Sequence, residues 1–345
     1  MSINVSVVIP VFTPDLAYFK IALESVLAQS GLDQLEIFVV DDSPNDAVEA
    51  FIATNYADRV TYVRGRCTGL SDALNDGFAR SKFQYVARMD ADDLCTPNRL
   101  RTQIEFMRAS NVQVCGSNTA FIGAAWGIQH FPFTDGDIKF GLAFGCPISH
   151  PSVVLDREAL GKDLVYARGR AVSEDYELWT TLARLGFRFA NIQEPLIRYR
   201  IHKNQATQTR KDVMVRTSES MRRAYCVFYF QGSALLKFLN EDRYQNFDFI
   251  DSREFVEFMQ LYFEEAAARH VDGASAFRIL YPLLMKQTFF SASLFRRTVG
   301  LMRSHGLLVR NFDYWIAEIR ALFGLHSNAS QIRALKKWFK YNNNQ

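Results

Sequence analysis

Short, mainly apolar runs alternate with amphipathic stretches along about the first two hundred residues. The apolar runs are typical of parallel strands buried on both faces, and they lie at 5–11, 35–40, 60–63 and 85–87. Between them, apolar residues recur at helical spacing at 16–27, around 48–52 and at 71–81. This alternation predicts an α/β fold with a right-handed, mostly parallel sheet that binds its ligands along one edge.

The pattern then gives way to helices alone. Further strands are predicted at 112–115, 119–122, 187–192 and 195–199, before helices at 213–230, 255–268, 276–290, 295–303, 312–323 and 332–339. Because 345 residues exceed the usual size of one domain, we expect two. The predicted division is a ligand-binding domain at 1–204 and a helical domain at 205–345.

Composition limits the compartment and the partners. The chain has 29 Phe and 14 Tyr, 5 scattered Cys without a C-x-x-C pair, and a net charge of only +3. The cysteine pattern indicates reduced thiols in a cytoplasmic protein. The first residues have neither the basic region nor the long apolar core of a signal peptide. No run meets the requirement for a membrane span, and no nucleic-acid-binding module is recognised.

Basic residues gather at the end of the chain. They outnumber acidic residues ten to two from Lys286 onward, and the run Lys336–Lys340 joins cations to Trp338 and Phe339. Interfacial helices have this composition, so we expect peripheral contact with the cytoplasmic face of the inner membrane. Formation of a homo-oligomer through the helical domain is the competing use.

Three carboxylates, Asp90, Asp92 and Asp93, follow the apolar run at 85–87. After them, Thr96 is the predicted N-cap of a helix and Pro97 its first residue. An acidic turn can simply favour the positive end of a helix. However, carboxyl ends of parallel strands face the ligand crevice, so like charges crowded there are expected to bind a cation. Mg²⁺ or Mn²⁺ uses one or two carboxylates together with phosphate oxygens, and we interpret the triplet Asp90-Ala91-Asp92 as a metal-diphosphate site.

A second acidic pair, Asp41-Asp42, closes the apolar run at 35–40. Asp before Ser-Pro-Asn is also common turn chemistry. A carboxylate at a strand end can in addition accept the N3–H of a uracil ring, and both uses can coexist. The position of the pair at the predicted ligand edge favours ligand contact.

Four of these segments together carry a family resemblance. The runs VSVVIPVF, VVDDSPND, GLSDALNDG and MDADD resemble the nucleotide-binding half of inverting GT-A-fold glycosyltransferases of family 2, which serve bacterial polysaccharide, O-antigen and capsule assembly. The resemblance covers roughly the first 200 residues. Gly69, Asn75 and Gly77 match the family segment beside the nucleotide, whereas Leu74 stands where an Arg is usual. Arg64, Arg66 and Arg80 are candidates to replace that Arg.

The resemblance implies roles for the strand ends. Pro10, Val11 and Phe12 would line the nucleoside pocket, and Asp41 or Asp42 would contact the pyrimidine. Gly69 and Asn75 would lie beside the nucleotide. Asp90 would hold the ribose and share the metal, and Asp92 would bind the metal directly.

Later segments would complete the site. His150, in the run His-Pro-Ser-Val, would contact the sugar or acceptor, although a single His is often structural. Glu174-Asp175 opens a helix, where acids are expected from the helix dipole alone. By resemblance this pair supplies the catalytic base, Asp175, with Glu174 orienting it or the acceptor, because inverting transfer needs a carboxylate to take the acceptor's proton.

The run Leu-Ile-Arg-Tyr-Arg-Ile-His resembles the closing element of the family. His202 would complete the metal's coordination or contact the β-phosphate, and Arg200 or Arg198 would neutralise the leaving group. The alternative for Arg198 is a solvated edge strand.

These observations predict a metal-dependent (Mn²⁺ or Mg²⁺) inverting glycosyltransferase with a GT-A fold and a helical C-terminal domain. The donor would be a UDP-hexose or UDP-N-acetylhexosamine, and the acceptor a glycan or lipid-linked oligosaccharide of surface polysaccharide synthesis. Two alternatives remain open: a sugar nucleotidyltransferase, whose Gly-rich basic loop is missing from Val11–Pro14, and a catalytically silent glycan-binding subunit.

Overall fold

The computed structural model describes residues 2–169, 172–202, 211–240, 249, 251–286, 297–298, 300–302 and 304–307. The chain forms two compact units, Met1–Trp126 with His130–Gln231 (unit 1) and Gly127–Gln129 with Gly232–Gln345 (unit 2). The roles and the boundary that we assigned to two domains from the sequence stay predictions. None of the described helices is long and apolar enough to cross a membrane.

Unit 1 is built around a mostly parallel sheet. Its strands are β1 (Asn4–Val11), β2 (Gln34–Asp41), β3 (Thr61–Arg64), β4 (Tyr85–Arg88), β5 (Leu94–Cys95), β6 (Val114–Gly123), β8 (Val154–Asp156) and β9 (Phe189–Ile201). They lie in the order β3-β2-β1-β4-β8-β6-β9-β5. The pairs among β1 to β4 and the pair β6–β9 are parallel, whereas β8 and β5 run antiparallel to their neighbours. The predicted α/β sheet is therefore confirmed.

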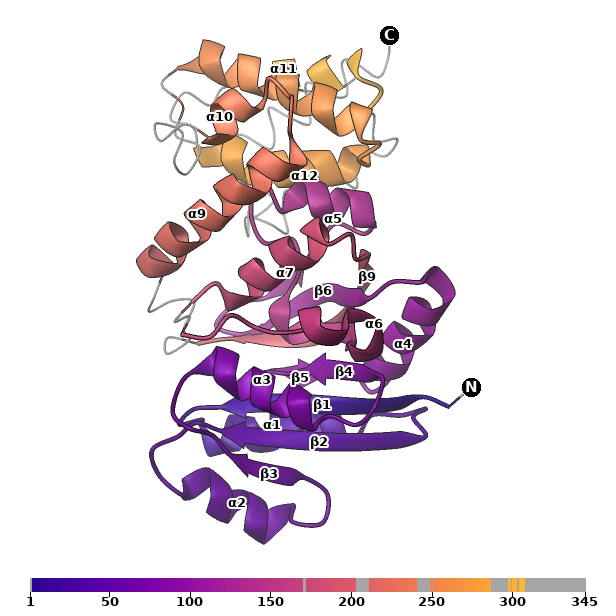
Figure 1. Ribbon diagram of the computed structural model, residues 1–345, viewed down its shortest axis with the longest axis vertical. Coiled ribbons are helices and arrows are strands. Elements are labelled where there is room, and N and C mark those ends of the chain that lie inside the picture. The colour runs from indigo at the N-terminus through magenta and orange to yellow at the C-terminus, as the bar shows by residue number, and fades with distance from the viewer. Residues whose placement is uncertain are drawn as a thin grey trace. The chain divides into compact units, whose positions relative to one another are not determined.

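Helices cover both faces of this sheet (Figure 1). The helices of unit 1 are α1 (Leu16–Leu27), α2 (Ala47–Asn55), α3 (Leu70–Arg80), α4 (Arg99–Ser110), α5 (Asp135–Gly141), α6 (Arg157–Leu160), α7 (Glu174–Arg184) and α9 (Lys211–Tyr229), with short 3₁₀ turns η1 (His150–Ser152) and η2 (Gly161–Asp163). Alternate β1 residues such as Val7 and Ile9 pack with α1, α2 and α4 in one core. On the opposite face, α3 approaches so closely that a Cβ on Gly77 would lie 2.3 Å from Val8 Cγ1.

The predicted start of α4 is wrong. Thr96 is not its N-cap and Pro97 is not its first residue, because α4 begins at Arg99 with Asn98 in the N-cap position. The preceding residues are drawn into the sheet: Leu94 and Cys95 form β5 against β9, and the Thr96 N–H donates to Leu196 O at 3.0 Å. Pairing with a strand about a hundred residues away thus moves the helix start, which local capping signals do not reveal.

Two pairs of predicted strands are single strands. The segments 112–115 and 119–122 join into β6, and 187–192 and 195–199 join into β9. These strands pair in parallel, with register shifts near Ser117, Asn118 and Thr119. The irregularity coincides with Asn118 of β6 and with Pro195 opposite it in β9.

Unit 2 has an aromatic core. The described elements of unit 2 are β7 (Gly127–Gln129), α10 (Leu236–Asn240), α11 (Ser252–Ala268) and α12 (Gly273–Lys286). Phe249 contacts the rings of Phe255 and Phe258 with centroids 4.9 Å apart in both cases. The Tyr262 hydroxyl donates to Ala276 O at 2.6 Å and so joins α11 to α12. The predicted helices at 312–323 and 332–339, and the basic aromatic run Lys336–Lys340, lie outside the described residues.

Candidate active site

Neighbouring parallel strands bring the predicted site residues to one edge of the sheet. Val11 at the end of β1 is paired with Asp41 at the end of β2, and Val8 with Arg88 at the end of β4. The loops that follow these strands therefore begin side by side. Their polar residues form two clusters, and a third cluster lies at the start of α7.

The first cluster follows β1 and β2. Pro10 and Val11 are buried within the sheet, whereas Phe12, next in the chain, is 67% exposed. Only Phe12 of these three can offer its side chain to a ligand. The turn is fixed from the neighbouring loop, because the Thr13 N–H donates to Ser43 Oγ at 2.8 Å.

Both carboxylates of the Asp41-Asp42 pair are buried and hydrogen-bonded. Asp41 accepts from the Tyr62 hydroxyl at 2.9 Å and the Ser43 N–H at 2.9 Å. Asp42 accepts the backbone N–H groups of Cys67 at 3.1 Å and Gly69 at 2.7 Å. The two carboxylates therefore stabilise turns through hydrogen bonds to backbone N–H groups, which was one of the two predicted uses. Asp42 holds the loop that leads into α3, while the predicted pyrimidine contact stays a prediction.

Of the candidates to replace the missing Arg, Arg66 and Arg80 are exposed, and Arg64 is engaged in ion pairs. Leu74 is fully buried in the core. Arg64 forms ion pairs with Asp46 and with Glu49 at 3.0 Å, on α2 and just before it. The Asn75 side-chain amide forms two hydrogen bonds with the backbone of Tyr166: Nδ2 donates to Tyr166 O and Oδ1 accepts from the Tyr166 N–H, both at 2.8 Å.

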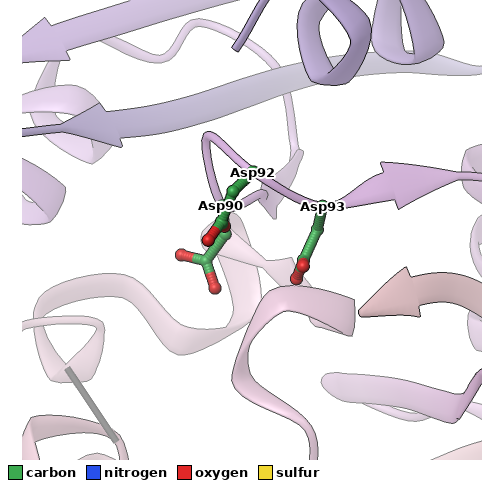
Figure 2. Close-up of side chains that lie close together, drawn as sticks. All are labelled: Asp90, Asp92 and Asp93. Atoms are coloured by element: carbon green, nitrogen blue, oxygen red, sulfur yellow. The ribbon is translucent and has the colours of Figure 1, made fainter. Parts of the chain in front are cut away.

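The second cluster is the acidic loop after β4. Asp90, Asp92 and Asp93 each place one carboxylate oxygen so that the three oxygens lie within 4.8 Å of one another. Figure 2 shows their carboxylates pointing to the same side of the loop. The Ala91 side chain instead packs against the core. Burial and the charges of Asp90 and Asp92 raise the pKa of Asp93, whose buried Oδ2 has no hydrogen-bond partner in the described part of the chain.

Arg88, which sequence reasoning missed, supports this loop from inside. Its guanidinium is only 3% exposed and forms two bonds with Asp90, Nη1–Oδ2 at 2.8 Å and Nη2–Oδ1 at 2.5 Å. Burial raises the pKa of Asp90, Arg88 lowers it, and the charges of Asp92 and Asp175 raise it. Arg99, also buried, donates to Arg88 O at 3.0 Å and so fixes the strand end. No sequence signal pointed to Arg88, because a lone Arg at the end of an apolar run resembles any other such residue.

The closing element lies against the acidic loop, as the resemblance implied. His202 Nε2 lies 2.8 Å from Asp92 Oδ2. The Arg200 N–H donates to Asp93 Oδ1, and its Nε donates to Asp92 O, both at 2.8 Å. Tyr18, another residue missed from sequence, places its ring 4.2 Å from the Arg200 guanidinium, an attractive cation–π geometry. By contrast, Arg198 is exposed on β9.

The third cluster is the acid pair at the start of α7. Asp175 Oδ1 accepts the Tyr176 N–H at 2.7 Å, and the exposed Cys146 thiol lies 3.7 Å from Asp175 Oδ2. Burial raises the pKa of Asp175, while Tyr176 and Arg88 lower it. Burial, together with the charge of Asp175, raises the pKa of Glu174 to about 7. The pair therefore holds protons more tightly than exposed acids do.

His150 lies beside this pair. Its Nδ1 is 3.8 Å from Glu174 Oε1, and its Nε2 is 2.7 Å from the Tyr166 hydroxyl. Burial and the charge of Arg88 lower the pKa of His150 well below its usual value, so the ring is neutral. With this arrangement His150 is both a structural histidine and a neighbour of the acid pair.

Comparison with known proteins identifies the family. The sequence model described as Glycosyl transferase family 2 matches residues 6–151. The chain is 32% identical over 199 residues to the amylovoran biosynthesis glycosyltransferase AmsE of Erwinia amylovora, covering 54% of this chain and 72% of AmsE. The chain belongs to glycosyltransferase family 2. It is therefore a glycosyltransferase, and the nucleotidyltransferase alternative is dropped.

Other members of family 2 and solved structures agree with this placement. The chain is 26% identical to WfaP of Escherichia coli, over 62% of this chain and 88% of WfaP. WfaP is named as a UDP-Glc:alpha-D-GlcNAc-diphosphoundecaprenol beta-1,3-glucosyltransferase. S. aureus TarS 1-349 in complex with UDP-GlcNAc superposes with a TM-score of 0.56 at 12% identity, over 88% of this chain and 90% of that chain. This likeness confirms the GT-A-type fold with a helical C-terminal region.

A further solved structure has the same fold. The mannosyltransferase PcManGT from Pyrobaculum calidifontis, in complex with GDP-Man and Mn²⁺, superposes with a TM-score of 0.50 at 15% identity. The superposition covers 94% of this chain and 89% of the PcManGT chain. At this identity the likeness concerns the fold, so the metal and donor of the present enzyme have to be argued from its own residues.

Proposed function

We propose that this family 2 enzyme is a metal-dependent, inverting glycosyltransferase. It moves a hexose or N-acetylhexosamine from a UDP-sugar to a saccharide acceptor, a lipid-linked oligosaccharide of surface polysaccharide synthesis. The observation that carries this proposal is one shared charge network around Arg88. That buried cation pairs with Asp90, and its charge interacts with that of Glu174, so the acidic loop after β4 and the acid pair of α7 lie within electrostatic range of one guanidinium.

The acidic loop fits a hard divalent cation. Asp90 and Asp92 offer carboxylate oxygens, the ligands that Mg²⁺ and Mn²⁺ prefer, and His202 lies on Asp92 to complete the set. Asp93, in the same loop, has a buried Oδ2 that finds no hydrogen-bond partner among the residues that the structure describes. A bound cation would supply positive charge that stabilises the diphosphate as it leaves. Arg200, held on Asp92 O and stacked on Tyr18, adds charge of the same sign.

The acid pair fits the transfer step. In the proposed reaction Asp175 takes the proton from the acceptor hydroxyl, the hydroxyl oxygen bonds to the anomeric carbon, and the bond to the diphosphate oxygen breaks on the opposite face. The Tyr176 N–H orients Asp175 Oδ1, leaving Oδ2 beside the weak Cys146 donor. The N-terminus of α7 favours the anionic carboxylate, which a base requires.

The donor pocket is proposed at the ends of β1 and β2. Phe12 is exposed and can stack on a nucleobase, as aromatic side chains commonly do. Asp41 or Asp42 is the carboxylate we expect to receive the N3–H of uracil; each already accepts two hydrogen bonds, so the contact would use a remaining lone pair. The named donor and acceptor of WfaP support a UDP-sugar and a diphospholipid-linked saccharide.

A donor panel tests this proposal. Purified enzyme is incubated with Mn²⁺, a diphospholipid-linked saccharide and each of several UDP-sugars, with GDP-mannose as the comparison, and release of the nucleoside diphosphate is followed. We expect release from a UDP-sugar only, loss of release in excess EDTA, and an inverted anomeric configuration by NMR of the product. Full activity in EDTA, a retained configuration, or release from GDP-mannose alone would contradict the proposal.

A further inference from the structure

Tyr166 lies against the acid pair, although no sequence motif points to it. The residue precedes α7 on the segment after η2 and is 1% exposed. Its ring packs on Phe78 and His150, with centroids 5.8 Å and 5.5 Å apart. The two Asn75 hydrogen bonds clamp its backbone N–H and C=O to α3. Tyr166 is thus held at its backbone and at its ring, which fixes where its hydroxyl points.

The hydroxyl contacts His150. Tyr166 OH lies 2.7 Å from His150 Nε2, and no second hydrogen-bond partner of this hydroxyl is found in the part of the chain that the structure describes. The other ring nitrogen, Nδ1, faces Glu174 Oε1 at 3.8 Å. Because the buried ring is neutral, it carries a single proton, on one nitrogen or the other.

The two tautomers differ in what they leave unsatisfied. With the proton on Nε2, His150 donates to Tyr166, the tyrosine proton has no acceptor, and the Nδ1 lone pair faces the Glu174 carboxylate. With the proton on Nδ1, Tyr166 donates to Nε2 and an N–H faces the carboxylate. A buried donor without an acceptor costs free energy whatever the charge of Glu174, and facing lone pairs add to this cost when Glu174 is ionised, so the second tautomer is favoured.

We propose that Tyr166 is a positioning residue: its hydroxyl donates to Nε2 of His150 and so directs the Nδ1–H at Glu174. This inference rests on the proposed function, in which Glu174 orients the base or the acceptor. At 3.8 Å the Nδ1–H and the Glu174 carboxylate are too far apart for a hydrogen bond, so the N–H acts on that carboxylate electrostatically. The other groups that face Glu174 are Arg88 on β4, Asp90 after it, and Cys146 before η1.

NMR of the histidine ring nitrogens tests the tautomer directly. In enzyme labelled with ¹⁵N-histidine, the signals of residue 150 are assigned by comparison with His150→Gln. We expect Nδ1 protonated and Nε2 unprotonated, with the Nε2 signal shifted in Tyr166→Phe. Tyr225→Phe is the matched control, since it removes another buried tyrosine hydroxyl, which donates to Lys139 O at 2.9 Å. A proton on Nε2, or an unchanged signal in Tyr166→Phe, would overturn the proposal; the wild-type spectrum alone decides if the variant does not fold.

Kinetics separate this inference from the function on which it rests. Tyr166→Phe is expected to lower kcat about two- to tenfold, the effect of one hydrogen bond, with KM for the donor unchanged. Tyr225→Phe is expected to keep both constants. If Asp175→Asn turns over normally, the proposed function itself fails. If Asp175→Asn is inactive while Tyr166→Phe keeps the wild-type kcat, only the role of Tyr166 is refuted.

Discussion

Glu174→Gln tests the electrostatics of the buried acid pair through stability. Burial and the neighbouring Asp175 raise the pKa of Glu174 from 4.5 to about 7. A carboxyl group with a higher pKa in the folded than in the unfolded state binds more protons when folded. Its contribution to stability is therefore complete below pH 4.5 and is lost as the pH rises toward about 7. This direction is the opposite of that for a carboxylate in an ion pair.

The size of the effect follows from the shift. The difference between 4.5 and about 7 is 2.5 units, and at about 1.36 kcal/mol per unit the upper limit is about 3 kcal/mol. Gln keeps the shape and an acceptor oxygen but has no charge to bury. We therefore expect Glu174→Gln to be more stable than the wild type by about 1–3 kcal/mol at about pH 8, and the difference to shrink toward about pH 5.

Urea unfolding followed by fluorescence measures this difference. The enzyme is kept in EDTA without donor, so that no bound cation changes the charge of the site. Glu177→Gln, the same chemical change in the first turn of the same helix, is the matched control and is expected to keep the wild-type pH dependence. The reasoning is refuted if Glu174→Gln is no more stable than the wild type at about pH 8, or if its stability changes with pH as the wild type's does.

Three further predictions concern activity and packing. Because burial raises the pKa of the base Asp175, kcat should still increase with pH above the range in which an exposed Asp titrates, and a profile already flat above that range would contradict this. Asp42→Asn should destabilise unit 1 by about 1–3 kcal/mol in urea, since one backbone N–H of the next loop loses its acceptor; an unchanged midpoint would argue against that contact. Gly77→Ala should cost about 1–3 kcal/mol, because its Cβ would lie 2.3 Å from Val8 Cγ1, whereas Gly145→Ala, where nothing lies within 4 Å, should be neutral by the same measurement.

The parts of the fold that local pattern controls were predictable. Helix α1 begins at Leu16 and ends at Leu27, as its apolar spacing indicates, and the β1 and β2 strands follow their apolar runs. Features set by distant pairing were not. Strand β5 exists because Leu94 and Cys95 pair with β9, and that pairing also displaces the start of α4.

The candidate site shows the same division. Acidic residues at strand ends could be recognised from their position in the sequence. The structure brings Asp90 and Asp92 together with His202, which directly follows β9. Buried partners such as Arg88 and Tyr166 carry no such signal, because a lone Arg or Tyr in an apolar context resembles any other core residue. Their roles depend on tertiary contacts, which a single sequence does not display.

One pair of variants tests the central claim, that the loop after β4 holds the donor diphosphate through a cation while α7 supplies the base. Binding of UDP with Mn²⁺ is measured by calorimetry, and turnover by UDP release, for Asp92→Asn and Asp175→Asn. We expect Asp92→Asn to lose both, and Asp175→Asn to bind UDP as the wild type does while its kcat falls about 10²- to 10⁴-fold. Near-normal turnover of Asp175→Asn, or unimpaired Mn²⁺-dependent UDP binding by Asp92→Asn, would contradict the account.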